Sequence, residues 1–320
     1  MLERAMPKRA HAATSGQIGH VSPALEAPLT LSQRVFGGIR LAMPKPPRPA
    51  PVSTEPLGRI GALEVRLAAT PREIKQAQKL RYKVFYEEMS AIPDMQTQLS
   101  RRDRDGFDKI CDHLLVIDHD TRTAAGAPKI VGTYRLLRQA VAERHSGFYT
   151  ASEFNIGALT ARHDRLNFLE LGRSCVLPPY RTKRTVELLW HGIWSYVRSH
   201  GIDVMVGCAS LTGTDPDALA LPLAFLHHNA RAPEEWSVSA IAGRHVAMDQ
   251  LPAEAVDAKA ALKLLPPLVK GYLRLGAYVG DGAVIDRQFG TTDVLIVLPV
   301  SAISERYVNH YGVDATRYAT

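Results

Sequence analysis

The sequence predicts an α/β protein built around one central sheet. The chain has 320 residues, of which 46% are hydrophobic and 22% are charged, so a coiled coil, a collagen and a wholly disordered chain are excluded. From residue 61 onward, short apolar segments typical of strands alternate with longer segments of helical period, and no internal repeat is present. This alternation indicates layers of helices packed on a sheet.

The first folded elements are predicted from their ends. A strand is expected over Ala62–Ala68. A helix is expected over Pro71–Met89, because Thr70 is a good N-cap residue and a proline suits the first helical position. The charged stretch Ser100–Asp108 follows, and strands are then predicted over His113–Ile117 and Ile130–Leu137.

The remaining elements continue the alternation. A longer apolar strand is predicted over Arg165–Val176 and is followed by two prolines. The pattern then predicts a helix, a strand, two helices, a last strand and a short helix. These are Arg184–Ser199, Asp203–Cys208, Asp215–His228, Asp257–Leu275 with a break at Pro266-Pro267, Val294–Val300 and Ser301–Tyr311.

The first 56 residues differ from the rest in composition and charge. They contain nine of the 21 prolines, and Pro44–Pro51 is typical of an extended, polyproline-like spacer. They hold seven basic and three acidic side chains, a net +4 of the chain's +7, which leaves +3 for the other 264 residues. We predict a basic, proline-rich, disordered extension over residues 1–56 and a folded domain over residues 57–320. The favoured interpretation of residues 29–43 is that they are disordered like the rest of this extension, and the alternative is a short interfacial helix on anionic lipid.

Several kinds of site are disfavoured by residue spacing. The three cysteines lack the close pairs of a disulfide framework or a zinc knuckle, and His227-His228 has no second ligand pair. Neither a G-x-S-x-G nor a G-x-G-x-x-G motif is present. His113 and Asp118 match an acyltransferase H-x-x-x-x-D dyad, but strand residues five apart point to opposite faces. We therefore predict no metal and no redox cofactor.

The charge and hydropathy of the chain also predict its cellular location and its partners. No stretch approaches the roughly 18 apolar residues of a membrane span, and no secretory-type apolar run follows the N-terminus. We expect a cytoplasmic protein with a peripheral contact to the inner membrane through its tail. Because the folded part carries only +3 and no recognition motif, no nucleic-acid partner is expected.

Charged side chains within otherwise apolar elements are the main candidates for chemistry. Buried charges are costly unless they are paired, so the set predicts either a core salt-bridge network or a substrate site. The candidates, with one aromatic residue four positions after the first, are Arg81, Phe85, Asp105, Asp108, Arg135, Glu170 and Arg173.

The spacing of Glu170 and Arg173 makes a geometric prediction. Residues three apart on a regular strand point to opposite faces. Gly172 lies between them, and a β-bulge there would return both side chains to one face and splay the sheet beside a cleft. A regular ladder through Gly172 would exclude a shared site.

Four segments carry a resemblance to a known family. L-R-Y-K-V-F-Y-E-E-M at 80–89, F-D-K-I-C-D-H-L-L-V at 107–116, V-G-T-Y-R-L-L at 131–137 and L-E-L-G-R-S-C-V at 169–176 resemble the L-ornithine N-alpha-acyltransferase family. The late segments Leu265–Gly276 and Asp286–Asp293 are also similar. This family is the acyl-carrier-protein-dependent branch of the GNAT superfamily that makes lyso-ornithine lipid in bacteria. The resemblance covers about residues 62–300 and implies a GNAT-like fold with a mixed, splayed sheet.

The resemblance also implies roles for the candidate residues. Glu170, partly desolvated in the sheet, is the candidate general base, and either Arg135 or Arg173 would orient it or hold the substrate carboxylate. Glu170 and Arg173 are the predicted catalytic residues. The predicted substrate-binding residues are Arg81, Phe85, Asp105, Asp108 and Arg135. The related acyl-homoserine-lactone synthases share this framework, so the framework by itself does not identify the amine.

The acyl donor is predicted from a departure from the superfamily pattern. The usual [Q/R]-x-x-G-x-[G/A] loop holds coenzyme A phosphates on backbone N–H groups. Val176–Thr185 lacks those glycines and presents Arg181, Lys183 and Arg184 at a predicted helix start. This basic rim suits a phosphopantetheine phosphate and an acidic carrier protein. The expected reaction is transfer of a 3-hydroxyacyl group from acyl carrier protein to the α-amine of L-ornithine, the first step of ornithine lipid biosynthesis.

Two alternatives stay open at this point. An acyl-homoserine-lactone synthase, or another amino-acid N-acyltransferase, would use the same framework with a different amine. A non-catalytic basic module that binds a membrane or nucleic acid belongs to another class.

Overall fold

The computed structural model describes residues 55–307 and residue 318. The predicted N-terminal extension, including residues 29–43 and the alternative of an interfacial helix there, lies outside the described residues except for its last two positions. Among the helices of the described part, none combines the length and the hydropathy that crossing a bilayer requires.

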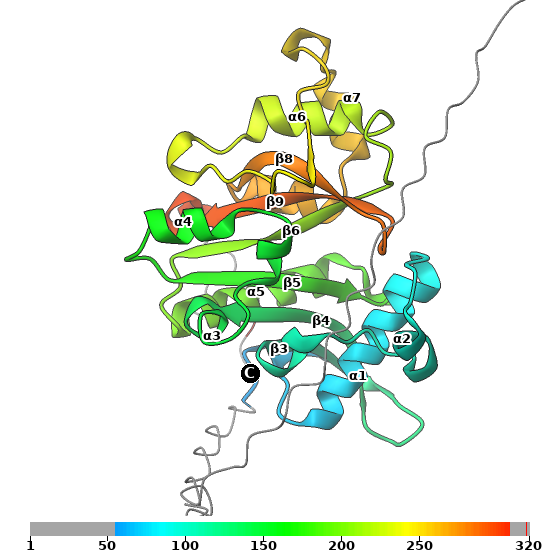
Figure 1. Ribbon diagram of the computed structural model, residues 1–320. Helices are drawn as coiled ribbons and strands as arrows, with labels where there is room; N and C mark the ends of the chain where they lie inside the picture. The colour runs from blue at the N-terminus through cyan, green and yellow to red at the C-terminus, as the bar shows by residue number, and fades with distance from the viewer. Residues whose placement is uncertain (1–54, 308–317, 319–320) are drawn as a thin grey trace, which may run out of the picture. The chain divides into compact units, whose positions relative to one another are not determined.

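One mixed sheet of nine strands organises the fold (Figure 1). The strand order is β1-β2-β3-β4-β5-β6-β9-β8-β7, and every neighbouring pair is antiparallel except β5 and β6. The predicted class, a mixed sheet flanked by helices, is confirmed. The strands are β1 (Gly58–Ile60), β2 (Leu63–Leu67), β3 (Asp112–Arg122), β4 (Pro128–Arg138), β5 (Phe168–Val176), β6 (Val204–Thr212), β7 (His245–Val246), β8 (Tyr278–Asp286) and β9 (Thr291–Pro299).

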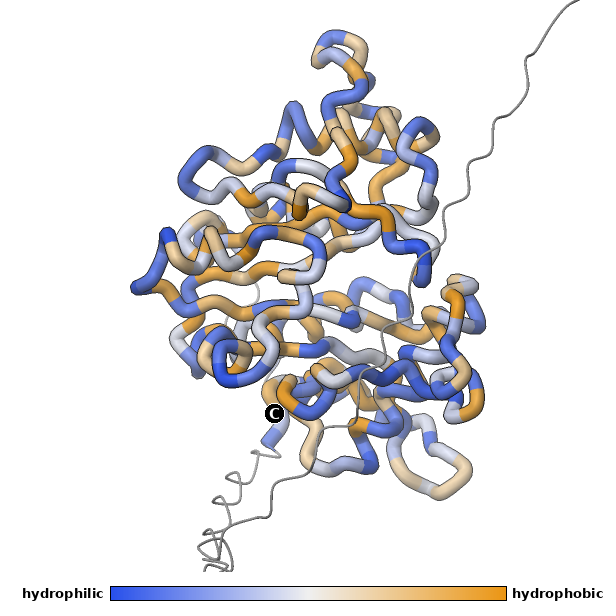
Figure 2. The backbone as a smooth tube through the Cα atoms, in the orientation of Figure 1, coloured by the Kyte–Doolittle hydropathy of each residue, from blue (hydrophilic) through white to orange (hydrophobic). Residues whose placement is uncertain are grey.

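Helices cover both faces of the sheet. A Cβ atom at Gly192 of α5 would contact Leu114, so α5 packs on the face to which Leu114 points. His113 points to the opposite face, where it contacts Asp108, the partner of Arg81 in α1. Figure 2 shows the apolar residues concentrated along the strands between these layers. The α-helices are α1 (Pro71–Tyr82), α2 (Met95–Ser100), α3 (Gln139–Ala142), α4 (Ile156–Arg162), α5 (Lys183–Ser199), α6 (Ala220–Ala230), α7 (Ala258–Leu264) and α8 (Pro267–Arg274).

The helix predicted over residues 71–89 starts at its predicted cap but changes type. Thr70 and Glu73 form a reciprocal capping box ahead of a proline in the first turn. The α-helical part nevertheless gives way to a π-helical segment, Lys83–Glu88. Short π-helical segments are frequent at functional sites, and Phe85 lies in this one.

The sequence pattern does not predict β1, β7 or β8, and β8 shows why. Its middle contains Gly280-Asp-Gly282, which is typical of a turn. The pairing of β8 with β9 shifts register between Val279 and Ala283, and Gly282 has a φ of 79°. A bulge therefore interrupts the alternation that would have marked this segment as a strand.

Other predicted elements differ at their ends. The strand expected from Arg165 begins at Phe168, and the helix expected over Asp215–His228 begins at Ala220. The long helix predicted over Asp257–Leu275 is two helices, α7 and α8, separated at the predicted proline break. The helix predicted over Ser301–Tyr311 starts instead with a 3₁₀ turn, and its last four residues lie outside the described residues.

β5 and β6 diverge along their length. Their parallel pairing covers Phe168–Glu170 and Val204–Val206, and beyond it β5 pairs with β4 while β6 pairs with β9. The predicted splay of the sheet is therefore confirmed. At the start of the splay, a Cβ atom on Gly207 would lie 2.3 Å from the carbonyl oxygen of Leu171. Only glycine allows the backbones to approach this closely.

Replacing this glycine should destabilise the domain. In Gly207→Ala, one strand must move away from the other, and we expect a loss of about 1–3 kcal/mol in the free energy of unfolding, measured by urea denaturation. Gly157→Ala in α4 is the matched control, because a Cβ atom there meets no atom within 4 Å. Equal stability of the two variants would contradict the close approach.

Candidate active site

A fully buried arginine connects α1 to the charged loop after α2. The side chain of Arg81 has no exposed surface, and its Nε donates to Asp103 Oδ2 at 2.7 Å. Its Nη2 donates to Asp108 Oδ1 at 2.8 Å. A guanidinium held by two carboxylates in this way is compensated in the interior. These contacts support a positioning role for Arg81, and its predicted role in substrate binding stays a prediction.

Asp105 and Asp108 form the ends of a small capping box. Asp105 precedes the 3₁₀ turn Gly106–Lys109 and Asp108 lies within it; Asp105 accepts the N–H of Phe107, and Asp108 accepts the N–H of Asp105. Arg135 Nη1 donates to both carboxylate oxygens of Asp105, at 2.7 and 2.8 Å. Burial opposes ionisation of Asp105, but the charge and hydrogen bonds of Arg135 outweigh it and hold the pKa of Asp105 below its usual value.

The predicted bulge is present in β5. Thr133 pairs with Cys175 and Arg135 pairs with Gly172, so two residues of β5 lie opposite one of β4. The left-handed conformation falls on Arg173, with a φ of 51°, rather than on Gly172. A non-glycine residue there costs about 1–3 kcal/mol. The bulge turns Arg173 toward Asp103 and Asp105, at 3.4 and 3.5 Å, on the face that also carries Arg135.

Glu170 faces the same side and is held by backbone donors. Its Oε2 accepts from the N–H of Tyr149 at 3.0 Å, and its Oε1 accepts from the N–H of Thr150 at 2.7 Å. Burial raises the pKa of Glu170 above its usual value, although these hydrogen bonds lower it. Arg173 lies 4.9 Å from the centroid of the Tyr149 ring, so one segment contacts both predicted catalytic residues.

Aromatic rings complete the surroundings of Arg173. The guanidinium lies 4.9 Å from the Phe289 ring centroid as well as from Tyr149, a distance typical of cation–π contact. Phe289 also packs edge-on against Phe85, with centroids 5.6 Å apart. The predicted residue Phe85 therefore contacts the site indirectly, through the ring of Phe289 that packs against Arg173.

The predicted carrier-protein residues lie apart from this cluster, at the start of α5. Arg181 forms an ion pair with Glu88 at 2.5 Å, and its Nε donates to Val176 O at the end of β5. Lys183 lies 3.7 Å from Glu187, and Arg184 is exposed. Two of the three basic charges are thus partly balanced by neighbouring glutamates.

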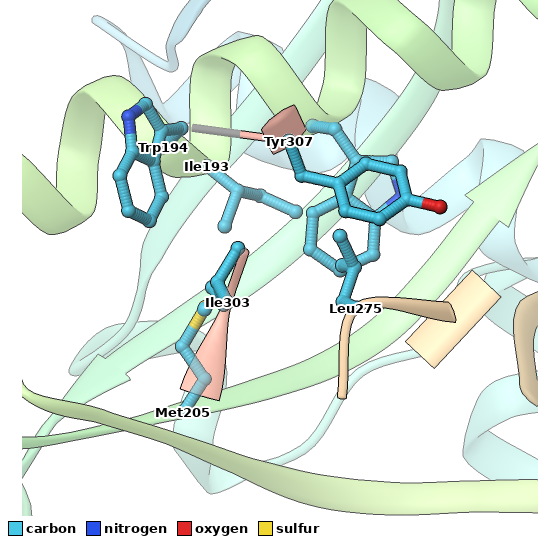
Figure 3. Close-up of a pocket in the computed structure, with 7 residues that line it drawn as sticks. Ile193, Trp194, Met205, Leu275, Ile303 and Tyr307 are labelled. Carbon is cyan, nitrogen blue, oxygen red and sulfur yellow. The ribbon is translucent and has the colours of Figure 1, made fainter. Parts of the chain in front are cut away.

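An apolar pocket lies on the α5 face of the sheet, opposite Glu170 (Figure 3). Its lining comes from α5, β6 and the C-terminal part of the described chain. Met205 also lines a second, smaller cavity with Leu171 and Gly207, where β5 and β6 part. The pocket residues drawn in Figure 3 include Ile193, Trp194, Met205, Leu275, Ile303 and Tyr307.

A second polar cluster is formed by residues that the sequence analysis does not single out. Glu153, Asp286 and Asp293 each place one carboxylate oxygen within 4.8 Å of the others, which is a spacing that could hold a metal ion. The three acids are too far apart in sequence to form a recognisable ligand motif. The prediction that His113 and Asp118 form no dyad is confirmed, since His113 contacts Asp108 and Asp118 contacts Tyr180.

Six of the predicted site residues come together on one face of the sheet, although their chemical roles stay predictions. They are Arg81, Asp105, Asp108, Arg135, Glu170 and Arg173. Sequence reasoning missed Asp103, Tyr149 and Phe289. The alternation Asp103-Arg-Asp105 inside the charged stretch was a usable signal for the first. Tyr149 and Phe289 lie in loops whose patterns resemble ordinary aromatic core positions.

Removing the buried arginine should unfold the region. In Arg81→Met, Asp103 and Asp108 lose their compensating charge in the interior, and we expect a loss of about 3–5 kcal/mol in the free energy of unfolding. Arg101→Met is the control, because Arg101 pairs with Glu87 at the surface with 70% of its side chain exposed. Its cost should be below about 1 kcal/mol. Thermal and urea unfolding of both variants measure the difference, and similar losses would refute this account.

Comparison with known proteins places the site in a family. Residues 80–191 match the model of an acetyltransferase (GNAT) domain. The solved structure of an N-acyl amino acid synthase from uncultured soil microbes aligns with 75% of this chain and 91% of its own, with a TM-score of 0.42 and 11% identity. An acyl-homoserine-lactone synthase aligns with 73% of this chain and 89% of its own, with a TM-score of 0.39 and 12% identity.

Much closer relatives are found among characterised sequences. The L-ornithine N(alpha)-acyltransferase of Rhizobium meliloti (strain 1021) is 58% identical over 271 residues, covering 85% of this chain and 91% of its own. The enzyme of the same name from Brucella abortus (strain 2308) is 56% identical over 265 residues, covering 82% and 93%. On identity and coverage of this extent, the chain belongs to the L-ornithine N(alpha)-acyltransferase family, and it is an acyltransferase with a GNAT domain.

Proposed function

We propose that this protein transfers a 3-hydroxyacyl group from acyl carrier protein to the α-amine of L-ornithine and so forms lyso-ornithine lipid. The observation that carries acyl transfer at this site is the bulge in β5, which brings Glu170 and Arg173 to one face beside the splay. The choice of ornithine is supported by the names of the relatives that align over most of the chain.

The chemistry begins with a proton transfer. An α-ammonium group has a pKa near 8 and must lose a proton before its nitrogen can attack. Glu170 is the acceptor in this proposal, and burial makes its carboxylate a stronger base. Because both of its oxygens already accept backbone N–H groups, the proton reaches Glu170 through a water molecule. Each carboxylate oxygen retains a free lone pair for that contact.

The acyl transfer then follows at the splay. The amine nitrogen forms a bond to the thioester carbonyl carbon, and it gives up its second proton as the C–S bond breaks. That proton ends on the departing thiolate, which leaves as the carrier thiol. Backbone N–H groups of the diverging strand between Gly172 and Cys175 are suited to stabilise the oxyanion of the intermediate. Arg173 or Arg135 would hold the substrate carboxylate on the same face as Glu170.

Two features support a long acyl chain on a carrier protein. The small apolar pocket behind the splay favours an acyl chain as its occupant, but it must widen to admit one, because it has room for about one water molecule. Met205 lines both this pocket and the space where the strands part. The basic rim of Arg181, Lys183 and Arg184 lies at the α5 N-terminus, where a phosphate group is stabilised by the helix dipole. A tail resting on the membrane would bring the enzyme to where its lipid product is used.

A reconstituted reaction tests the proposal. Purified protein, 3-hydroxyacyl-acyl carrier protein and L-ornithine should yield N-α-acylornithine by mass spectrometry, because the donor and the amine are both supplied. Parallel reactions contain lysine, glycine or S-adenosylmethionine in place of ornithine, and an acyl-coenzyme A in place of the carrier protein. A homoserine lactone product, or no product from ornithine, would refute the proposed function.

Neutralising Glu170 should slow the chemical step without unfolding the protein. In Glu170→Gln we expect kcat to fall by about 100- to 10,000-fold, because the base is lost. The wild-type rate should fall as acid protonates Glu170, at a pH above the ordinary glutamate range because its pKa is raised. The variant should lack this acidic limb. Glu143→Gln, at an exposed position, is the control. An unchanged pH–rate profile in Glu170→Gln would remove Glu170 from the base role.

A further inference from the structure

Arg81, Arg135 and Arg173 and their three aspartate partners form what we call the arginine framework. A cluster of three carboxylates lies on the same sheet face as Glu170 but outside this framework. Glu153 follows the 3₁₀ turn Tyr149–Ser152, Asp286 ends β8 and Asp293 lies in β9. Glu153 and Asp293 are buried, with 2% and 6% of their surface exposed. One oxygen from each acid lies within 4.8 Å of the other two. The cluster thus concentrates negative charge where water is largely excluded.

This negative charge is only partly compensated. Within the described residues, ion pairs at 4.0 Å or less connect the cluster to Arg244 alone, whose Nη2 lies 3.4 Å from Glu153 Oε1. Arg244 also donates to the carbonyl oxygens of Ser152 and Ile285. The other oxygen of Glu153, Oε2, is buried and has no nitrogen or oxygen donor among the described residues, and the Cys208 thiol gives this carboxylate only a weak hydrogen bond. A buried acceptor without a strong donor indicates that one is missing.

The protonation of the cluster is consistent with a missing cation. Burial, and then the charge of Asp293, raises the pKa of Glu153 to about 7. Burial also raises the pKa of Asp293 above its usual value. A cation bound among these groups would lower both values by favouring their charged forms.

The cluster is connected to the active site on two sides. The N–H of Glu153 donates to the carbonyl of Thr150, whose own N–H donates to Glu170 at 2.7 Å. Asp286 accepts the N–H of Phe289 at 3.0 Å, and the Phe289 ring lies against Arg173. A small substrate held near Arg173 and Glu170 would therefore extend toward the three acids.

We propose that Glu153, Asp286 and Asp293 bind the terminal ammonium group of a diamino-acid substrate whose carboxylate is held on the arginine side. This inference rests on the proposed function and assigns the selection of ornithine to these acids. An ammonium group has three donors. Three acceptors at about 2.8 Å from one tetrahedral nitrogen lie about 4.6 Å from one another. The three carboxylate oxygens lie within 4.8 Å of one another, so their spacing is compatible with this arrangement. The acids thus discriminate by charge between ornithine and apolar amino acids of equal length.

The test compares two substrates that differ only in the terminal amine. L-Norvaline has the carbon chain of L-ornithine without the δ-ammonium group. Wild-type protein should prefer ornithine in kcat/KM on the order of 100-fold. Asp293→Asn and Glu153→Gln should each raise KM for ornithine by about tenfold or more and leave the kinetics with norvaline unchanged. Asp249→Asn, an exposed acid outside the cluster, should alter neither substrate.

Several outcomes would overturn the inference. Equal losses for ornithine and norvaline in a folded variant, checked by thermal unfolding, would make the cluster a structural element. Chelation of wild-type protein that removes activity, with rescue by Mg²⁺ only when the three acids are intact, would make it a metal site. Wild-type protein that acylates both amines equally would refute the inference while the proposed function stands. If no amine is acylated, the proposed function fails, and calorimetric binding of ornithine against norvaline still decides the inference.

Discussion

Mutual compensation of buried charges is the interaction on which the rest of the site depends. Three arginines, from α1, β4 and β5, interlock with three aspartates from one short loop. None of these charges would be tolerated alone in the interior, so each holds the others in place. The loop between α2 and β3 is thereby fixed against the sheet, and the strand that carries Glu170 is fixed with it. Catalytic geometry and folding stability are therefore supplied by the same contacts.

The bulge in β5 converts this framework into a site. Without the extra residue, Arg173 and Glu170 would point to opposite faces. The left-handed conformation of Arg173 is strained, and the strain is offset by two carboxylates and two aromatic rings around its guanidinium. The orientation of the site thus depends on the bulge, which lies just beyond the point where β5 and β6 part.

The sequence was sufficient where local rules decide the structure. The capping box at Thr70 and the bulge near Gly172 were predictable, because residue spacing determines both. Local rules did not suffice where distant contacts decide. The left-handed residue is Arg173 because tertiary ion pairs select it over glycine, and β8 is a strand despite its glycines because β9 pairs with it. Tyr149 and Thr150 contact Glu170 through backbone N–H groups, which no side-chain motif records.

The strand order has a consequence for the sequence of events in folding. Strands β1 to β6 each pair with the strand next to them in the chain, so the arginine framework closes between consecutive strands, with α1 to α4 in the two longer connections. β6 also pairs with β9, which lies about 80 residues later in the chain, and Phe289 and the carboxylates of β8 and β9 arrive only with that pairing. Contacts between residues so far apart in sequence form late, because closing the intervening chain costs conformational entropy before the contacts stabilise the structure. The charged framework thus forms first, and the carboxylate cluster that we propose for amine binding is completed only when β8 and β9 have joined the sheet.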